Sequence, residues 1–337
     1  MEIDNEPTVK CQGLWFEDGN LIIHAGNTQF RVYRGVLAAR SPVFQDMLSF
    51  PQPPDSELVE GCPVVRLHDN THEVTDFLKA IFDSQFFEPY PAPTDIFVIA
   101  GVLRLSHKYG IDYLRRRAFV HLTSAFFTTL SAYDDSIEAD DGIPWKLPSW
   151  AIPDSYVFPA LVYVVQLARE VGGLWILPYA FYQLAEACPN KPDVLSCIKL
   201  DSFAGFPALL SEDDQSSFVK GYCVQISTAT SDVLRFLRTP QIIPGCRTPH
   251  GCLLSRLEAL DLTHSDLDTA AFKADPLLLW YGRDWDRLAD ACDTCVASLK
   301  AASQATRQAF WDQLPQMYGL PPWEELEKIK AEALGQT

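Results

Sequence analysis

Residues 30–47 read FRVYRGVLAARSPVFQDM, and this stretch decides the fold of the first part of the chain. Its apolar residues first alternate along the sequence, as in a strand, and Leu37 and Phe44 then follow helical spacing on either side of Ser41. Serine caps a helix start with its side-chain oxygen and proline fits the first helical position, so Ser41 and Pro42 mark a helix start. The stretch therefore predicts a strand that leads directly into helices.

The sequence on both sides of this stretch adds short strands and then more helices. Residues 21–24 and 30–33 predict a hairpin, because the intervening AGNT segment contains turn-forming residues. Residues 64–67 predict a third strand, and apolar spacing of i, i+3 and i+4 indicates helices after it. We therefore expect an α+β domain over residues 15–130, after a lead-in of residues 1–14. The predicted later helices cover residues 74–82, 96–109 and 111–127.

The second part of the chain is predicted to be all helical. Acidic residues and prolines dominate residues 131–154, which predicts an exposed linker. Beyond it, residues 155–337 show helical spacing, with a capping signal at Ser211 and a long helix over residues 285–314. Aromatic residues make up 12% of the chain, and they indicate either a helix–helix core or an exposed protein-binding groove.

Composition and charge argue against several classes of protein. The chain has 337 residues, of which 47% are hydrophobic, so it can bury a globular core. Its formal charge of −17 disfavours binding to nucleic acid and to anionic membranes. Its apolar runs are shorter than the ~20 residues of a membrane helix. Nine cysteines, an odd number without an amino-terminal signal sequence, favour reduced thiols and an intracellular location in the cytoplasm or the nucleus.

The common catalytic motifs are missing from the sequence. It lacks the G-x-S-x-G elbow, the phosphate-binding G-x-x-x-x-G-K-[ST] and G-x-G-x-x-G loops, and the zinc-binding H-E-x-x-H pair. We therefore expect a protein that is not an enzyme.

Four cysteines in the second part form the one constellation that indicates specific chemistry. Cys246 and Cys252 bracket a loop, and Cys292 and Cys295 form a C-x-x-C pair on a predicted helix, where i, i+3 spacing places both sulfurs on one face. Two such pairs can supply the four thiolates of a structural zinc site, and His250 could replace one of them. Core packing of small apolar thiols and a C-x-x-C redox pair are the alternative interpretations.

The first domain resembles a BTB/POZ domain. The similarity rests on Asp18 before the hairpin, the VLAARS segment with a phenylalanine three residues after it, the V-x-L-x-D segment 65–69 and the L-x-x-K-Y-G-I segment 105–111. Tyr33 stands where the family usually has histidine. The resemblance implies a non-enzymatic protein–protein interaction module that self-associates or recruits partners, among them cullin-type ubiquitin ligase scaffolds.

The resemblance also implies site residues and alternative functions. Asp18 and Arg34 match a charged pair that lines the dimer-groove pocket of the family, which implies a homodimer, and residues 86–88 lie near the segment that engages cullins. The proline-rich stretch after residue 50 and the segment 314–321 resemble BTB proteins from fungi, whose helical carboxy-terminal halves often carry paired cysteines. A substrate adaptor of a cullin-type ligase and a C-x-x-C thiol redox enzyme are the alternative functions.

Overall fold

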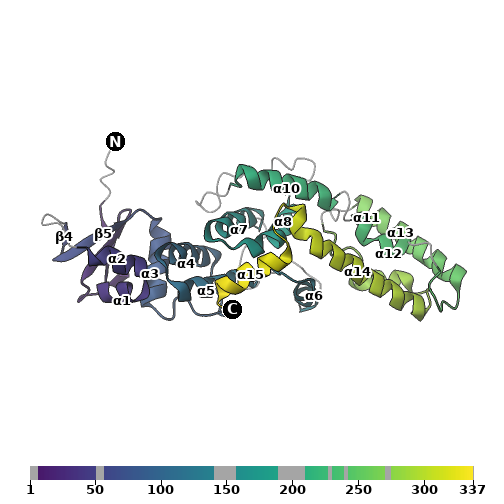
Figure 1. The fold of residues 1–337 in the computed structure, drawn as a ribbon, viewed down its shortest axis with the longest axis horizontal. Coiled ribbons are helices and arrows are strands. Elements are labelled where there is room, and N and C mark those ends of the chain that lie inside the picture. Colours follow the sequence, from purple (N-terminus) through teal and green to yellow (C-terminus); the bar gives the residue numbers. More distant parts are fainter. Residues whose placement is uncertain are drawn as a thin grey trace. The chain divides into compact units, whose positions relative to one another are not determined.

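The computed structural model divides the chain into two compact units, which are described separately. The first unit runs up to Ala125 and takes in the last residues from Ala333, and the second runs from Phe126 to Glu332. All strands among the described residues belong to the first unit (Figure 1). The structure describes residues 7–50, 57–139, 157–188, 209–226, 230–238, 242–269 and 275–336.

The first unit is built on a mixed five-stranded sheet. Its strands are β1 (Val9–Trp15), β2 (Leu21–Ala25), β3 (Thr28–Val32), β4 (Leu58–Val59) and β5 (Cys62–Leu67). Strands β2 and β3 form the predicted hairpin, in which Gly26 has a left-handed backbone (φ 57°) that suits glycine. Strand β5 pairs parallel with β2, and β1 pairs parallel with β3. The order across the sheet is β1-β3-β2-β5-β4.

Five helices complete the first unit within its described residues. They are α1 (Arg34–Arg40), α2 (Pro42–Ser49), α3 (Thr71–Phe82), α4 (Ile96–Tyr109) and α5 (Asp112–Thr123). The Ser41 hydroxyl accepts a hydrogen bond from the Phe44 amide (3.0 Å) and donates one to the Tyr109 carbonyl (2.5 Å). Gly110 ends α4 with a left-handed backbone (φ 68°). The helix start predicted at Ser41 is confirmed.

The core of the first unit joins the hairpin to the helices. Leu21, Phe30, Leu37 and Phe44 are fully buried, and the Phe44 ring stacks on Tyr109 with ring centroids 4.7 Å apart. The strands of the hairpin and the helices that follow therefore bury their apolar side chains in one shared core, which removes apolar area from water. The predicted α+β fold of this domain is confirmed.

The described residues of the second unit form helices joined by loops, and none of them forms a strand. Its elements are α6 (Leu130–Ala139), α7 (Val157–Val171), η2 (Leu174–Ile176), α8 (Leu177–Ala187), α10 (Glu212–Val224), α11 (Thr230–Val233), α12 (Arg235–Arg238), α13 (Pro249–Thr269), η5 (Gly282–Leu288), α14 (Asp293–Met317) and α15 (Trp323–Leu334). Tyr133, Tyr179 and Trp311 are buried, with their ring centroids 5.8–5.9 Å apart. For these rings, the interpretation as a helix–helix core is confirmed.

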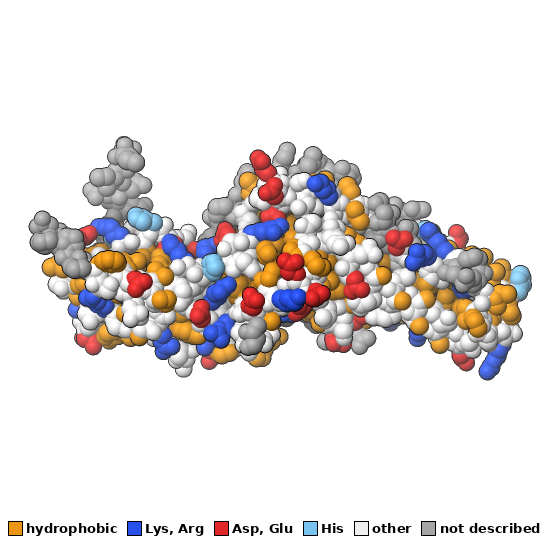
Figure 2. Space-filling view, in the orientation of Figure 1, with side chains coloured by type: hydrophobic (Ala, Val, Ile, Leu, Met, Phe, Trp, Pro, Cys, Tyr) orange, Lys and Arg blue, Asp and Glu red, His pale blue; other side chains and the backbone are white. Residues whose placement is uncertain are grey.

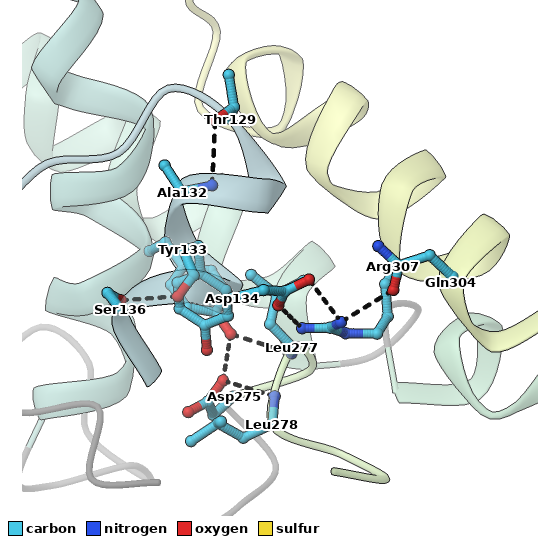
Figure 3. A network of polar contacts seen from close by, with 11 residues as sticks. Thr129, Ala132, Tyr133, Asp134, Ser136, Asp275, Leu277, Leu278, Gln304 and Arg307 are labelled. Carbon is cyan, nitrogen blue, oxygen red and sulfur yellow. Dashed lines mark hydrogen bonds and ion pairs between the residues drawn. The ribbon is translucent and has the colours of Figure 1, made fainter. Parts of the chain in front are cut away.

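A polar network lies inside the second unit (Figure 3). Arg307 of α14 donates two hydrogen bonds to the carboxylate of Asp134 on α6, one of them at 3.1 Å, and a further one to the Gln304 side chain at 3.2 Å. The Tyr182 hydroxyl donates to the fully buried Asp275 carboxylate. Burial raises the pKa of Asp275. The ion pair between Asp134 and Arg307 therefore joins α6 to α14, with Arg307 buried and Asp134 20% exposed.

Two boundaries differ from the sequence prediction. The predicted lead-in contains strand β1, because its residues find partners in β3, which lies later in the sequence. The predicted linker begins inside a helix, since residues 130–139 form α6 and bury Tyr133 and Ile137 at helical spacing. Residues 140–154 of that predicted linker lie outside the described residues.

Two helices also differ from the prediction. The long helix expected over residues 285–314 is interrupted, because η5 ends at Leu288 and α14 begins only after Cys292. Helix α13 was not predicted at all. Leu253, Leu254, Leu257 and Leu262 of this helix are exposed, so its leucines do not mark the face that the helix buries.

The cysteines and the surface complete the description. Among the described residues, seven cysteines are free thiols and Cys188 is disulfide-bonded, so the expectation of reduced thiols is wrong at this residue. None of the described helices is both long and apolar enough to cross a membrane. Figure 2 shows acidic, basic and apolar side chains interspersed over the visible face.

Candidate functional site

The four predicted cysteines come together in the second unit. Cys246 lies in the loop before α13, Cys252 in its first turn, and Cys292 and Cys295 at the start of α14. Their four sulfur atoms all lie within 4.8 Å of one another, and the sulfurs of Cys292 and Cys246 are 4.0 Å apart. A tetrahedral zinc ion with Zn–S bonds of ~2.3 Å holds its sulfurs ~3.8 Å apart. The cluster therefore has the size of a four-thiolate metal site.

Local backbone geometry places each pair of cysteines. Gly245 turns the chain with a left-handed backbone (φ 79°) immediately before Cys246. The Cys252 amide donates to the Thr248 carbonyl (2.9 Å), which forms the first turn of α13. Cys292 is the N-cap of α14, and its carbonyl accepts from the Cys295 amide at 2.8 Å. The C-x-x-C pair thus lies at the start of a helix. The sequence had predicted it inside a longer helix over residues 285–314.

Hydrogen bonds and burial shift the pKa values of the four thiols in opposite directions. The Cys292 amide donates to the sulfur of Cys252 at 3.3 Å, which lowers the pKa of Cys252. Backbone amides of Arg247 and Cys295 lower the pKa of Cys292 to about 6. Burial raises the pKa of Cys295 and that of Cys246. Four thiolates at this spacing repel one another, so a bound cation is what would let all four ionise together.

Arg256 places a positive charge near the four sulfurs. The sequence did not predict its part in the site. Its side chain is buried, and Nη2 donates to the Leu237 carbonyl at 3.3 Å. Burial lowers the pKa of Arg256, while the negative charges of Cys295 and Cys252 oppose that change. A divalent ion with four thiolates carries a net charge of −2, which a neighbouring guanidinium partly offsets. The i, i+4 spacing from Cys252 to Arg256 on one helix is the signal that could have found it.

His250, the predicted substitute ligand, lies outside the cluster. It is exposed in the first turn of α13, and the group of ligand atoms within 4.8 Å consists of the four cysteines alone. The cysteine set therefore fits a soft divalent metal such as zinc better than a mixed set with histidine.

The two residues predicted to line a protein-binding pocket lie at one end of the β2–β3 hairpin. Asp18 and Arg34 are both exposed. The Tyr33 hydroxyl donates to Asp18 at 2.6 Å, and this hydrogen bond raises the pKa of Tyr33. Arg34 donates through its side chain to the Leu48 carbonyl and through its amide to Asn20 (2.8 Å). No ion pair joins Asp18 to Arg34 within the described part of the chain, and their role in a contact with a second copy stays a prediction.

The segment 86–88 is fixed by contacts of its backbone to α5. The Phe87 carbonyl accepts from Arg117 at 2.5 Å, and the Glu88 carbonyl lies 2.8 Å from Nε2 of His121. The Phe87 ring is buried, whereas the Glu88 side chain is exposed. The segment therefore presents one acidic side chain from a rigid support.

Comparison with known proteins identifies the first unit. Residues 17–125 match the BTB/POZ domain family, and the match ends at the residue where the first unit ends. Neither the comparison with curated proteins nor that with solved structures gave a match. The chain therefore contains a BTB/POZ domain, as its sequence resemblance predicted, and this family consists of protein–protein interaction modules.

Proposed function

We propose that this protein is a non-enzymatic, intracellular interaction module whose BTB/POZ domain self-associates or recruits partner proteins. The observation that supports it best is the agreement between the family match over residues 17–125 and a compact unit with its own sheet, helices and core. The first unit would act as a docking platform, held rigid by that core, while the second unit would serve as a helical scaffold.

The charged residues Asp18 and Arg34 are proposed to line the contact between two copies. Asp18 precedes β2 and Arg34 follows β3, and the pairing of Leu21 with Val32 brings both to the same end of the hairpin. Both side chains are exposed, so they are available to a second copy. Charged groups at a contact fix the register of the partners and penalise a mismatch.

Light scattering tests this dimer. We expect the wild type at high micromolar concentration to have twice the chain mass of 37.8 kDa, and Asp18→Lys or Arg34→Glu to shift it toward the monomer. Arg66→Glu is a matched control, because Arg66 is an exposed arginine of the same unit that pairs with Glu57. A wild type that stays strictly monomeric at this concentration contradicts the homodimer.

A structural zinc ion is proposed at Cys246, Cys252, Cys292 and Cys295. The donor set is four thiol sulfurs within 4.8 Å of one another, with the buried Arg256 beside them. The ion would hold the starts of α13 and α14 together. Such a cross-link contributes folding free energy directly, since the site does not exist in the unfolded chain.

Elemental analysis separates zinc from a thiol redox pair. The redox alternative is favoured by the hydrogen bonds from the Arg247 and Cys295 amides, which lower the pKa of Cys292 to about 6, toward the range of a reactive thiol. Zinc predicts one equivalent of metal in the purified protein and thiols that alkylate only after chelation. A redox pair predicts no metal and rapid alkylation at Cys292 from the start.

A substrate adaptor of a cullin-type ubiquitin ligase is the second candidate. The rigid segment 86–88, with its exposed Glu88, supports it. In that case the full chain should capture a purified cullin amino-terminal domain, and Glu88→Lys should abolish the capture. If the Glu88→Lys variant still binds the cullin, segment 86–88 is not the cullin-binding segment.

A further inference from the structure

The four sulfurs of the cysteine cluster differ in how far water reaches them. Cys252 and Cys295 are each 2% exposed, and the neighbouring Arg256 is buried as well. Cys246 and Cys292 are partly exposed. A small molecule in solution therefore reaches the sulfurs of Cys246 and Cys292 before it reaches the other two.

The two partly exposed sulfurs are also close to each other. The sulfur of Cys292 lies 4.0 Å from the sulfur of Cys246. The amide of Arg247, the residue after Cys246, donates a hydrogen bond to the Cys292 sulfur, so the loop before α13 is held against the start of α14. A disulfide bond is ~2.05 Å long, and the approach of ~2 Å that the sulfurs need is within reach of a rotation of their side chains.

We propose that Cys246 and Cys292 are a site of reversible oxidation by hydrogen peroxide, and that their disulfide expels the metal ion. This inference rests on the zinc site proposed above. The thiolate of Cys292 attacks the peroxide, breaks its O–O bond and becomes a sulfenic acid, and hydroxide leaves. The thiolate of Cys246 then attacks the sulfenic sulfur and displaces a second hydroxide. The peroxide gains the two electrons that the thiolates lose and, with two protons from the solvent, becomes two water molecules.

The geometry favours Cys246 over Cys295 as the partner of Cys292. A sulfenic acid at Cys292 carries a polar hydroxyl group, which is costly to bury without a hydrogen bond. The oxidised sulfur therefore stays on the solvent side, where the sulfur of Cys246 is accessible and that of Cys295 is not. To close its own disulfide, the C-x-x-C pair would have to turn the sulfenic acid inward.

Oxidation would change what joins α13 to α14. An ion held by all four sulfurs links the first turn of α13, through Cys252, to the start of α14. The disulfide removes two of the four ligands, and the two buried thiols that remain are too few for a structural zinc site. The first turn of α13 keeps the hydrogen bond from the Cys292 amide to the Cys252 sulfur (3.3 Å) but loses its bond to the ion. Peroxide would therefore loosen the second unit at this point, and reduction in the presence of zinc would restore it.

The test exposes the full chain, loaded with zinc, to hydrogen peroxide. A chelating dye measures the released zinc, and mass spectrometry of peptides locates the disulfide. We expect equal amounts of released zinc and of disulfide between Cys246 and Cys292, with Cys252 and Cys295 left as thiols that iodoacetamide then alkylates. Dithiothreitol and added zinc should reverse both changes.

Two variants sharpen the test. Cys246→His keeps a zinc ligand but removes the thiol, so it should bind zinc and release it roughly tenfold more slowly in peroxide. Cys223→Ser is the matched control, because Cys223 is an exposed thiol of the same unit that lies outside the cluster. It should release zinc at the wild-type rate.

Three outcomes would overturn the proposal. The first is a disulfide between Cys292 and Cys295. The second is release of zinc from loaded Cys246→His at the wild-type rate. The third is retention of zinc in the wild type at a peroxide concentration that oxidises Cys223. Metal-free purified protein that still forms the disulfide between Cys246 and Cys292 would refute the zinc site, and with it the expulsion of an ion, but would support the pairing of these two thiols.

Discussion

The ion pair between Asp134 and Arg307 allows a quantitative test of the second unit. Its side chains are 20% and 7% exposed, so both charges are largely removed from water. The replacement Asp134→Ala leaves the guanidinium of Arg307 buried without its carboxylate. The same guanidinium keeps its hydrogen bond to Gln304 (3.2 Å) and lies 6.0 Å from the ring centroid of Tyr281.

These contacts set the expected magnitude. Removing one partner of a buried ion pair costs ~3–5 kcal/mol, because the other charge remains buried and unpaired. The contacts to Gln304 and Tyr281 offset part of that cost, at ~0.5–1.5 kcal/mol for a hydrogen bond. We therefore expect Asp134→Ala to lower the free energy of unfolding of the second unit by about 2–4 kcal/mol. Adding Arg307→Met should recover much of the loss, because no charge is then left buried.

Urea unfolding followed by tryptophan fluorescence measures this change, since the buried Trp175 and Trp311 belong to the second unit. Lys328→Ala is the control, because its pair with Glu324 is 70% and 83% exposed and should contribute at most ~1 kcal/mol. The reasoning is refuted if Asp134→Ala costs no more than Lys328→Ala, or if the double variant is less stable than the single one.

Further changes test the first unit and the metal centre. Ser41→Ala should cost about 1–2 kcal/mol in urea unfolding, because it removes a helix cap and a buried hydrogen bond. Phe44→Ala should cost ~3–5 kcal/mol in the same assay, with Val43→Ala, at an exposed neighbour, as control. Burial lowers the pKa of His121 below its usual 6.5, so the unfolded chain takes up the proton more readily. Stability of the first unit should therefore hold above pH ~6.5 and fall as the pH drops below it, and His121→Phe should flatten the profile. Chelation should lower the unfolding midpoint of the second unit and leave that of the first unchanged, as differential scanning calorimetry would show.

Local signals explain which parts of the fold could be predicted. The turn between β2 and β3, the cap at Ser41 and the stop at Gly110 each depend on a few adjacent residues, and all three are where the sequence placed them. Strand β1 was missed because its pairing with β3 is parallel and irregular, with the register moving from Lys10–Gln29 to Trp15–Arg31. No local pattern reports such a pairing.

In the cysteine cluster, too, the features set by adjacent residues could be predicted and the others could not. The spacing of Cys292 and Cys295 indicated that their sulfurs would share a face, and the clustering of both pairs is observed. The break before α14 was missed, because apolar spacing continues across it from Leu288 to Leu299. Arg256 was missed because arginine is seldom buried, so its i, i+4 spacing from Cys252 did not by itself mark it as part of the site.

The double role of the Ser41 hydroxyl has a consequence for how the first unit assembles. One oxygen atom completes the start of α2 and at the same time reaches the carbonyl of Tyr109, a residue 68 positions away. The start of α2 can therefore reach its full stability only once the end of α4 is in place. A chain truncated before Tyr109, or still growing on the ribosome, would keep the cap between Ser41 and the Phe44 amide but lack the hydrogen bond that ties this cap to α4.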